Sequence, residues 1–263
     1  CFVIGSNLFS NCVLYLTEET CRLPNVNFST IMRTIYNKSN PFYVIMIAGE
    51  FAGKESVLPS QYFSVHPKNP QTRSIAQIAE IVRRGGVIVY PTDSVYAIGC
   101  HIGDKNALER IRAIRQLDKK HNFTLVCRDL SELANYAKVD NAAFRIIKAS
   151  TPGAFTFILN ATSEVPKRLM HPKRKTIGIR VPQSAIVKAL LDELGEPMMS
   201  VTLSMPGDEY PLSDPYDIKQ SMSHYVDAVV DGGYCGHEPT TVVDMTDSSP
   251  QVLRHGQGDF AGY

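Results

Sequence analysis

The sequence predicts an α/β fold, in which helices pack around a largely parallel or mixed β-sheet. Short runs of apolar, β-favouring residues alternate along the chain with segments whose apolar residues recur at helical spacing, and this alternation is typical of α/β domains. The 263 residues are 44% apolar, which is ample for the core of one large domain. The formal net charge of +1 excludes an overall polycation, so any contact with nucleic acid has to come from local basic patches.

Four segments carry the signals of helices. In the first, apolar residues recur at i, i+3, i+4 and i+7 from Ile75 to Val82, and Gly85-Gly86 ends the helix. Each of the other three follows a residue that can cap a helix N-terminus, and Gly195 ends the last of them. The expected caps are Asp104, Asp140 and Ser184.

Seven runs between these helices are predicted as strands from their β-branched and aromatic content. They are Val87–Tyr90, Phe123–Val126, Ala154–Leu159, Thr176–Val181, Met198–Leu203, Tyr225–Val230 and Thr240–Asp244.

The stretch that follows the first strand is the most informative part of the chain. Pro91 stops the strand, and Thr92-Asp93-Ser94 then places two hydroxyls and a carboxylate in a non-helical segment. Polar groups at the carboxyl end of a parallel strand lie where open α/β sheets bind ligands. The same residues can instead satisfy local backbone groups, and spacing alone leaves both interpretations open.

Residues 1–60 differ from the rest and are expected to form a poorly packed N-terminal extension or a wrongly placed start, with one domain over 61–263. Their apolar patches are far shorter than the ~20 residues that span a bilayer, so no membrane contact is expected. The six cysteines show no closely spaced pairs, which favours reduced thiols in a cytoplasmic protein. No metal site is expected, because no second ligand pair accompanies Cys100-His101 or Cys235-Gly236-His237.

Three further features could bind an anion or line a pocket. Arg115 is expected at the edge of a buried helical stripe, where a guanidinium can meet phosphate. Arg180 lies on a strand, and alternation places it with Gly178 on the face opposite Ile177 and Ile179. Such an arginine is usually paired with an acid or aimed at an anionic ligand. The hydroxyls of Ser200-Val201-Thr202-Leu203-Ser204 point one way, as cross-strand pairs or as a pocket lining. The basic run Lys167–Lys175 is either a solvated face or a binding patch.

Taken in order, five motifs make the chain resemble the YrdC/YciO family of threonylcarbamoyl-AMP synthase-like proteins, most closely its YciO branch. The motifs are Tyr90-Pro91-Thr92-Asp93-Ser94-Val95-Tyr96, Thr151-Pro152-Gly153, Thr176-Ile177-Gly178-Ile179-Arg180-Val181-Pro182, Gly195-Glu196-Pro197 and Glu238-Pro239-Thr240-Thr241-Val242-Val243-Asp244. The resemblance covers about residue 61 to the C-terminus. It implies a twisted mixed sheet flanked by helices, with a concave basic surface.

The resemblance also implies a function and a set of site residues. The implied ligands are ATP, L-threonine and bicarbonate, with Mg²⁺ bound to ATP, and the implied product is the precursor of a modified tRNA adenosine. No protein nucleophile is needed, so positioning and charge neutralisation dominate. Substrate binding is implied for Thr92, Arg180, Thr240 and Thr241, and nucleotide binding for Arg115, Thr202, Ser204 and Arg254.

The chain departs from the family pattern in two stretches on the phosphate side. In the family's Lys-Gly-Arg-Pro stretch, Arg115 replaces the lysine, Leu117 the arginine and Asp118 the proline, and the family's Ser-Ala-Asn is Thr202-Leu203-Ser204. Each lost contact to a charged group costs about 1.5–3 kcal/mol. Lys119, Lys120 or His121 are the candidates for the vacated place.

Two functions therefore stand at this point. The first is an enzyme that forms or hydrolyses a threonine adenylate, with reduced or altered activity. The second is a non-catalytic protein that binds double-stranded RNA or tRNA on the same basic surface.

Overall fold

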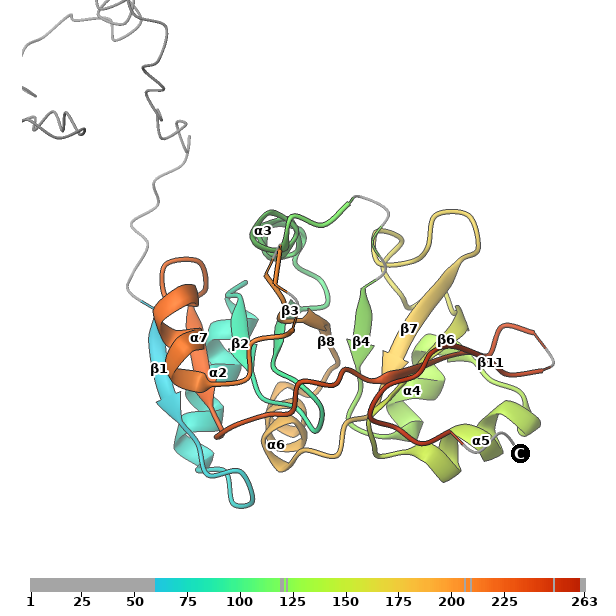
Figure 1. Ribbon diagram of the computed structural model, residues 1–263. Coiled ribbons are helices and arrows are strands. Elements are labelled where there is room, and N and C mark those ends of the chain that lie inside the picture. The colour runs from blue at the N-terminus through green and yellow to red at the C-terminus, as the bar shows by residue number, and fades with distance from the viewer. Residues whose placement is uncertain are drawn as a thin grey trace, which may run out of the picture. The chain divides into compact units, whose positions relative to one another are not determined.

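The computed structural model describes residues 60–118, 121, 123–205, 207–208, 210–247 and 249–260 (Figure 1). The predicted extension over residues 1–60 lies outside the described residues, apart from Ser60. Within the described part, no helix is both long enough and apolar enough to cross a membrane.

One mixed sheet organises this part of the chain. Its strands run in the order β1-β9-β2-β3-β8-β4-β7-β6-β10-β11, and β5 pairs with β6. The strands are β1 (Gln61–Ser64), β2 (Ile88–Tyr90), β3 (Ala97–His101), β4 (Thr124–Val126), β5 (Ala137–Lys138), β6 (Phe155–Ala161), β7 (Thr176–Arg180), β8 (Met198–Thr202), β9 (Ala228–Asp231), β10 (Thr241–Asp244) and β11 (Gln251–Arg254). Parallel pairs, such as β4 with β7 and β6 with β10, occur beside antiparallel pairs, such as β4 with β8 and β6 with β7, so the predicted mixed α/β sheet is confirmed.

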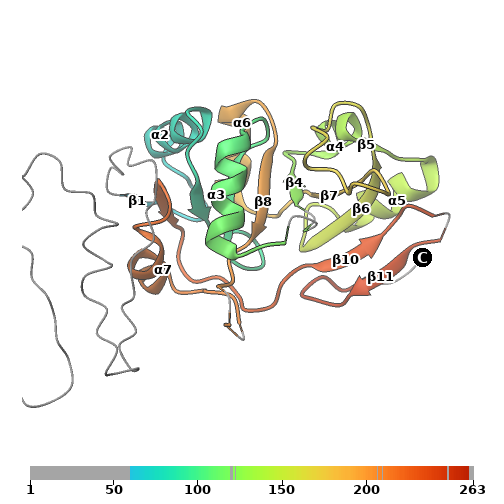
Figure 2. The ribbon, with the colours of Figure 1, turned by 90° about the horizontal axis from the view of Figure 1, so that it is seen from above.

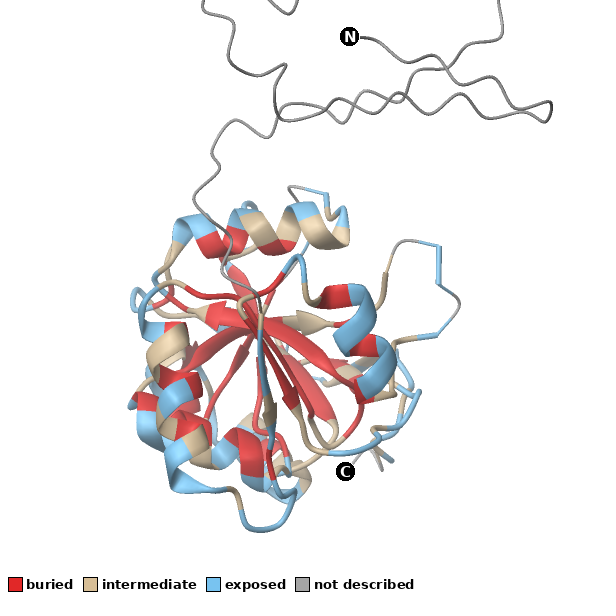
Figure 3. Cartoon of the chain, turned by 90° about the vertical axis from the view of Figure 1, so that its left-hand side faces the viewer, coloured by how far each residue is buried: buried red, intermediate tan, exposed pale blue. Residues whose placement is uncertain are grey.

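Helices cover both faces of this sheet. They are α2 (Thr72–Arg83), α3 (Lys105–Arg115), α4 (Leu130–Tyr136), α5 (Asn141–Ser150), α6 (Ala185–Leu194) and α7 (Pro215–Met222). Asp104, Asp140 and Ser184 cap α3, α5 and α6 through their side chains, and Gly195 ends α6 with φ +77°, as predicted. Figure 3 shows buried residues concentrated on the strands, with the outer sides of the helices exposed.

One apolar cluster lies on each face of the sheet, and more helices contribute to the first cluster than to the second. One contains residues of α3, α4, α5 and α7 packed on strand residues such as Leu125, Ile179 and Phe157. The other contains α2 and α6, packed on residues such as Tyr90 and Met198. Figure 2 shows β10 and β11 at the end of the sheet far from α2. On that second face, strands between the two ends therefore keep part of their surface uncovered by helices.

Several elements were not predicted, and the predicted start of one strand lay too early in the chain. Residues 97–101 form strand β3, buried between β2 and β8, where the sequence suggested loop. A strand buried on both faces lacks the apolar–polar alternation that reveals half-buried strands. The strand predicted from Tyr225 begins only at Ala228, because the amides of Tyr225 and Val226 both donate to the Met222 carbonyl in the turn after α7.

Candidate functional site

A cavity of about 420 Å³ opens on the uncovered sheet face. Its floor comes from alternate residues of neighbouring strands, in register across the sheet: Thr124 of β4 lies opposite both Gly178 of β7 and Ser200 of β8. The residues between them, such as Leu125 and Ile179, point into the core on the other face. The predicted alternation around Arg180 is thus confirmed, and the pleat of the sheet sets the cavity lining.

Arg180 is the buried cation of this floor, only 7% exposed. Its Nη2 donates to Thr92 Oγ1 at 3.1 Å, to Ser94 Oγ at 2.9 Å and to the Asp93 carboxylate. The second Asp93 oxygen accepts the amide of Gln183 at 2.8 Å. Arg180 is therefore both paired with an acid and part of the cavity wall, and the turn after β2 fixes the orientation of its guanidinium.

Buried hydroxyls surround this arginine and are held by each other. Tyr90 donates to Ser200 Oγ at 2.7 Å, and its burial raises its pKa to about 12. Thr156 and Thr240 share a hydrogen bond of 2.8 Å. Thr202 and Ser204 continue the row of hydroxyls along the cavity wall. Because these groups are fixed before any ligand arrives, they can orient polar substituents at little entropic cost.

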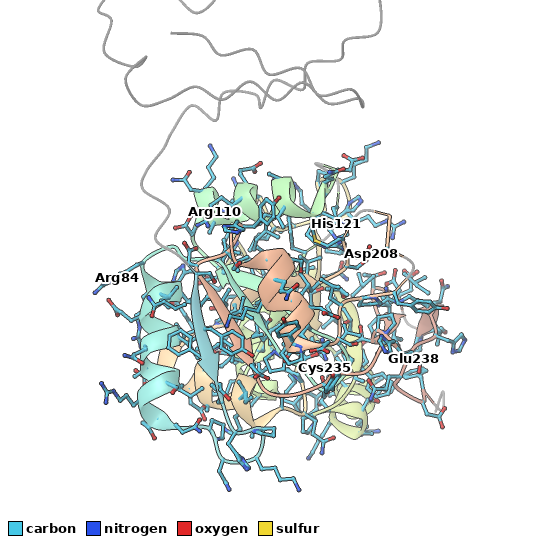
Figure 4. All side chains as sticks on the ribbon, turned by 60° about the vertical axis from the view of Figure 1, so that its left-hand side comes forward. Arg84, Arg110, His121, Asp208, Cys235 and Glu238 are labelled. Carbon is cyan, nitrogen blue, oxygen red and sulfur yellow. The ribbon has the colours of Figure 1, made fainter. Side chains whose placement is uncertain are left out.

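The arginines of α3 point in different directions. Arg110 pairs with Asp227 at 2.8 Å, and Arg112 pairs with Glu109 at 2.7 Å. Arg115, at the end of the helix, lines the cavity instead, and its buried Nε has no hydrogen-bond partner. Desolvation lowers the pKa of Arg115 from its usual value, while Asp208 acts in the opposite direction. Figure 4 shows Arg110 and Asp208 at separate places along the molecule.

The last strand supplies a third arginine. Arg254 of β11 donates through Nη2 to the Thr240 carbonyl at 2.9 Å and through Nε to the same oxygen at 3.2 Å. Partial burial lowers its pKa from the usual value, yet a guanidinium stays protonated at neutral pH. Among the described residues, the cavity lining holds three arginines and no carboxylate. Such a lining favours anions.

Six of the eight predicted site residues line this one cavity: Arg115, Arg180, Thr202, Ser204, Thr240 and Arg254. Thr92 stands directly behind it, in contact with Arg180. Thr241 points elsewhere: its hydroxyl donates to the Gly258 carbonyl at 2.5 Å and accepts the Gly256 amide at 2.9 Å. The structure thus brings seven of the eight predicted site residues to the cavity or into contact with Arg180, whereas the Thr241 hydroxyl bonds to the backbone near the C-terminus.

Replacing Thr241 with valine is expected to lower stability and leave ligand binding unchanged. Thr241 is fully buried, and the substitution leaves the Gly258 carbonyl and the Gly256 amide without this partner. Unsatisfied buried groups of this kind cost about 1–3 kcal/mol. Urea unfolding and calorimetric titration with L-threonine measure the two quantities. A loss of affinity at unchanged stability would contradict this role.

Sequence reasoning passed over Asp93, Ser94 and Thr156 as site residues. Thr156 is 9% exposed and stands alone among apolar neighbours in its strand, which was a usable signal. Asp93 and Ser94 were seen as part of a polar turn, but their contact with Arg180 joins residues more than 85 positions apart. Local sequence carries no signal for that pairing.

The residues that differ from the family pattern on the phosphate side offer few charged groups to the cavity. Leu117 packs against the apolar core and offers no donor to the cavity. Ser204 and Thr202 line the wall with hydroxyls only. His121 lines the cavity close to Arg115, whereas Lys119 and Lys120 lie outside the described residues.

Comparisons with known proteins agree with this geometry. A family model for Sua5, YciO and YrdC proteins, described as "Telomere recombination", matches residues 80–256. The chain is 60% identical over 200 residues to YciO of Escherichia coli, covering 76% of this chain and 97% of that protein. A protein of Haemophilus influenzae is 57% identical over 205 residues, covering 78% of this chain and 99% of its own length.

Two solved structures share the fold. The crystal structure of Escherichia coli YciO superposes with a TM-score of 0.75 over 77% of this chain and 98% of that one, at 60% identity. The structure of P. abyssi Sua5 complexed with L-threonine gives a TM-score of 0.69 at 24% identity, over 75% of this chain and 58% of that one. From the matched family model and the extent of these identities, the chain belongs to the Sua5/YciO/YrdC family.

Proposed function

We propose that the cavity binds L-threonine and the phosphate-bearing part of ATP, and that the protein is a threonylcarbamoyl-AMP synthase-like enzyme of reduced activity. The observation that carries this proposal is Arg180, a buried guanidinium fixed among three side chains of one turn and facing a cavity whose described lining contains no carboxylate. A threonine carboxylate would meet this cation, and the surrounding hydroxyls would accept or donate to its amine and hydroxyl. The P. abyssi Sua5 structure with L-threonine supports the assignment of this amino acid.

The reaction would join the threonine amine to bicarbonate and the resulting carbamate to the α-phosphate of ATP, releasing pyrophosphate and water. The reacting atoms all belong to the substrates, so the protein contributes alignment and charge neutralisation. Arg115 and Arg254 line the same cavity and would face the phosphates. Among the described residues, these two are the fixed charges assigned to the phosphates, and Leu117 packs against the core, so we expect the activity to be low.

Magnesium would arrive with ATP. Mg²⁺ prefers oxygen ligands, above all carboxylates and phosphates. Among the described residues, the cavity lining contains no carboxylate, so the chain itself does not fit the ion and the phosphates would have to hold it. Bicarbonate needs only the neutralising environment already described.

The direct test is an incubation with labelled bicarbonate, L-threonine and ATP. Formation of labelled threonylcarbamoyl adenylate, together with stoichiometric pyrophosphate, is the expected result, at a slow rate. If L-threonine binds but neither pyrophosphate nor AMP is released, the synthase assignment fails and only the binding site remains. A protein that does not bind L-threonine at all would remove the proposal entirely.

One observation favours a second function, binding of double-stranded RNA or tRNA. Lys167, Arg168, Lys173, Arg174 and Lys175 are all exposed on the loop between β6 and β7. Of these, Arg174 lies 3.8 Å from Asp244 and Arg168 donates to the Gly103 carbonyl, so the patch is only partly compensated. Binding to RNA through it should weaken steeply with salt, with a log–log slope that falls when three of these residues are replaced by glutamine.

A further inference from the structure

His121 lies at the phosphate side of the cavity and has no counterpart in the implied nucleotide-binding set. It follows the end of α3, where Figure 4 labels it, and its ring lies edge-on to Phe123 with centroids 5.8 Å apart. Arg112 stacks its guanidinium over the same Phe123 ring, 5.1 Å from the centroid. Phe123 therefore holds the imidazole and a guanidinium in fixed places beside Arg115.

The charges that face His121 are mostly positive. Desolvation lowers the pKa of His121 below its usual value, and the charges of Arg115 and Arg112 of α3 lower it further. Arg180 and Arg254 line the same cavity. Among the described residues, the acids of this region are Asp118, whose backbone carbonyl accepts the His121 amide at 2.9 Å, and Asp208, which acts on Arg115. At neutral pH the imidazole of the empty site is therefore uncharged.

A polyanion would reverse this balance. Two or more phosphate charges beside Arg115 would cancel the repulsion and favour the protonated imidazole, which offers two N–H donors. We propose that His121 and Arg115 together form the phosphate subsite of the cavity, and that His121 takes up a proton when a pyrophosphate-bearing ligand binds. This inference rests on the proposed function only in assigning such a ligand to the cavity.

The proposal gives the departure at Leu117 a physical consequence. A relative with a second fixed cation in this stretch grips phosphate equally at all physiological pH values, because a guanidinium does not titrate. In this chain the second cation would be an imidazole, so the grip strengthens as pH falls. The titratable imidazole of His121 thus takes the place of a guanidinium that is always charged.

Inorganic pyrophosphate is the probe for the test, titrated calorimetrically into the full chain at pH 6 and pH 8. The ratio of the two affinities is expected to be about tenfold larger for the wild type than for His121→Gln, which corresponds to about 1.4 kcal/mol. Protonation of pyrophosphate itself contributes equally to both proteins and cancels. His121→Arg is expected to bind tightly with the pH dependence of the glutamine variant. His224→Gln, an exposed histidine outside the cavity, should behave as wild type.

Nuclear magnetic resonance supplies an independent measurement. With histidine-labelled protein, the His121 signal, identified by its loss in His121→Gln, should show a pKa that rises when pyrophosphate saturates the site and stays unchanged with L-threonine. An unchanged or lowered pKa overturns the proposal, as does equal pH dependence in wild type and His121→Gln, or no binding of pyrophosphate. Failure to bind L-threonine, with the proton uptake intact, would instead overturn the proposed function and leave this subsite standing.

Discussion

Arg180→Ala is expected to weaken L-threonine binding by about 100-fold and to destabilise the fold. The first effect follows from losing a charge-assisted contact to the ligand carboxylate, since each such hydrogen bond contributes about 1.5–3 kcal/mol. The loss of stability follows because the Asp93 side chain, which is 9% exposed, would remain buried without its cationic partner. Removing one partner of a buried pair costs about 3–5 kcal/mol. Calorimetric titration and urea unfolding measure the two effects separately.

The double variant Arg180→Ala with Asp93→Asn separates binding from folding. It removes the stranded charge while the asparagine oxygen can still accept the Gln183 amide. Most of the lost stability is expected to return, and the lost affinity is not. If the double variant bound L-threonine like the wild type, Arg180 would not be the carboxylate contact. Arg180→Lys, which keeps the charge but loses the planar fork, should lie between wild type and alanine in affinity.

Gly178→Val is expected to reduce ligand binding by a similar factor, about 100-fold, by filling the cavity floor. A Cβ at this position would lie 3.1 Å from Thr124 Oγ1 and 3.5 Å from Thr156 Cγ2, so the two further methyl groups must project into the space between Arg180 and the hydroxyls. Valine suits a strand, but the Thr124 side chain has to shift slightly to admit its Cβ, so urea unfolding is measured beside binding. Binding of L-threonine and pyrophosphate, each by calorimetry, is the measurement.

Two variants calibrate that result. Gly178→Ala adds one methyl group and should cause a smaller loss in the same direction. Ile179→Val alters the next residue of β7, which points into the core on the other face. It should lower stability by about 0.5–1.5 kcal/mol and leave binding unchanged. Equal losses of binding for Ile179→Val and Gly178→Val would mean that the floor is not where the ligand sits.

The sequence was most informative where local physics decides the structure. Capping residues and apolar periodicity located α3, α5 and α6, and alternation placed Arg180 and Gly178 on one face. The α7 helix was missed although Asp214 followed by Pro215 is a helix-start signal, with the Asp214 carboxylate accepting the Tyr216 amide at 2.8 Å. Strand β1 was missed because four residues carry too weak a pattern.

Sequence reasoning failed where distant residues meet. The pairing of Asp93 with Arg180 depends on the order of strands in the sheet. Nothing in the local pattern encodes that order. The family resemblance supplied the grouping of the cavity residues instead, and it pointed to His121 only as one of three candidates for the place of the arginine that is missing at Leu117.

The parallel pairing of β10 with β6 has a consequence for how this site forms and changes. Thr240 and Arg254 reach the cavity only because the terminal hairpin adds to the sheet edge, with Thr241 opposite Phe155 and Val242 opposite Thr156. The Arg180 wall comes from the middle of the sheet, where β7 lies between β4 and β6. One wall of the cavity thus belongs to the centre of the sheet, and the other belongs to its edge. Substitutions at Thr240 and Arg254, which line the cavity, can therefore change what it accepts, whereas Thr241 and Val243 of the same hairpin are fully buried and hold it on the sheet.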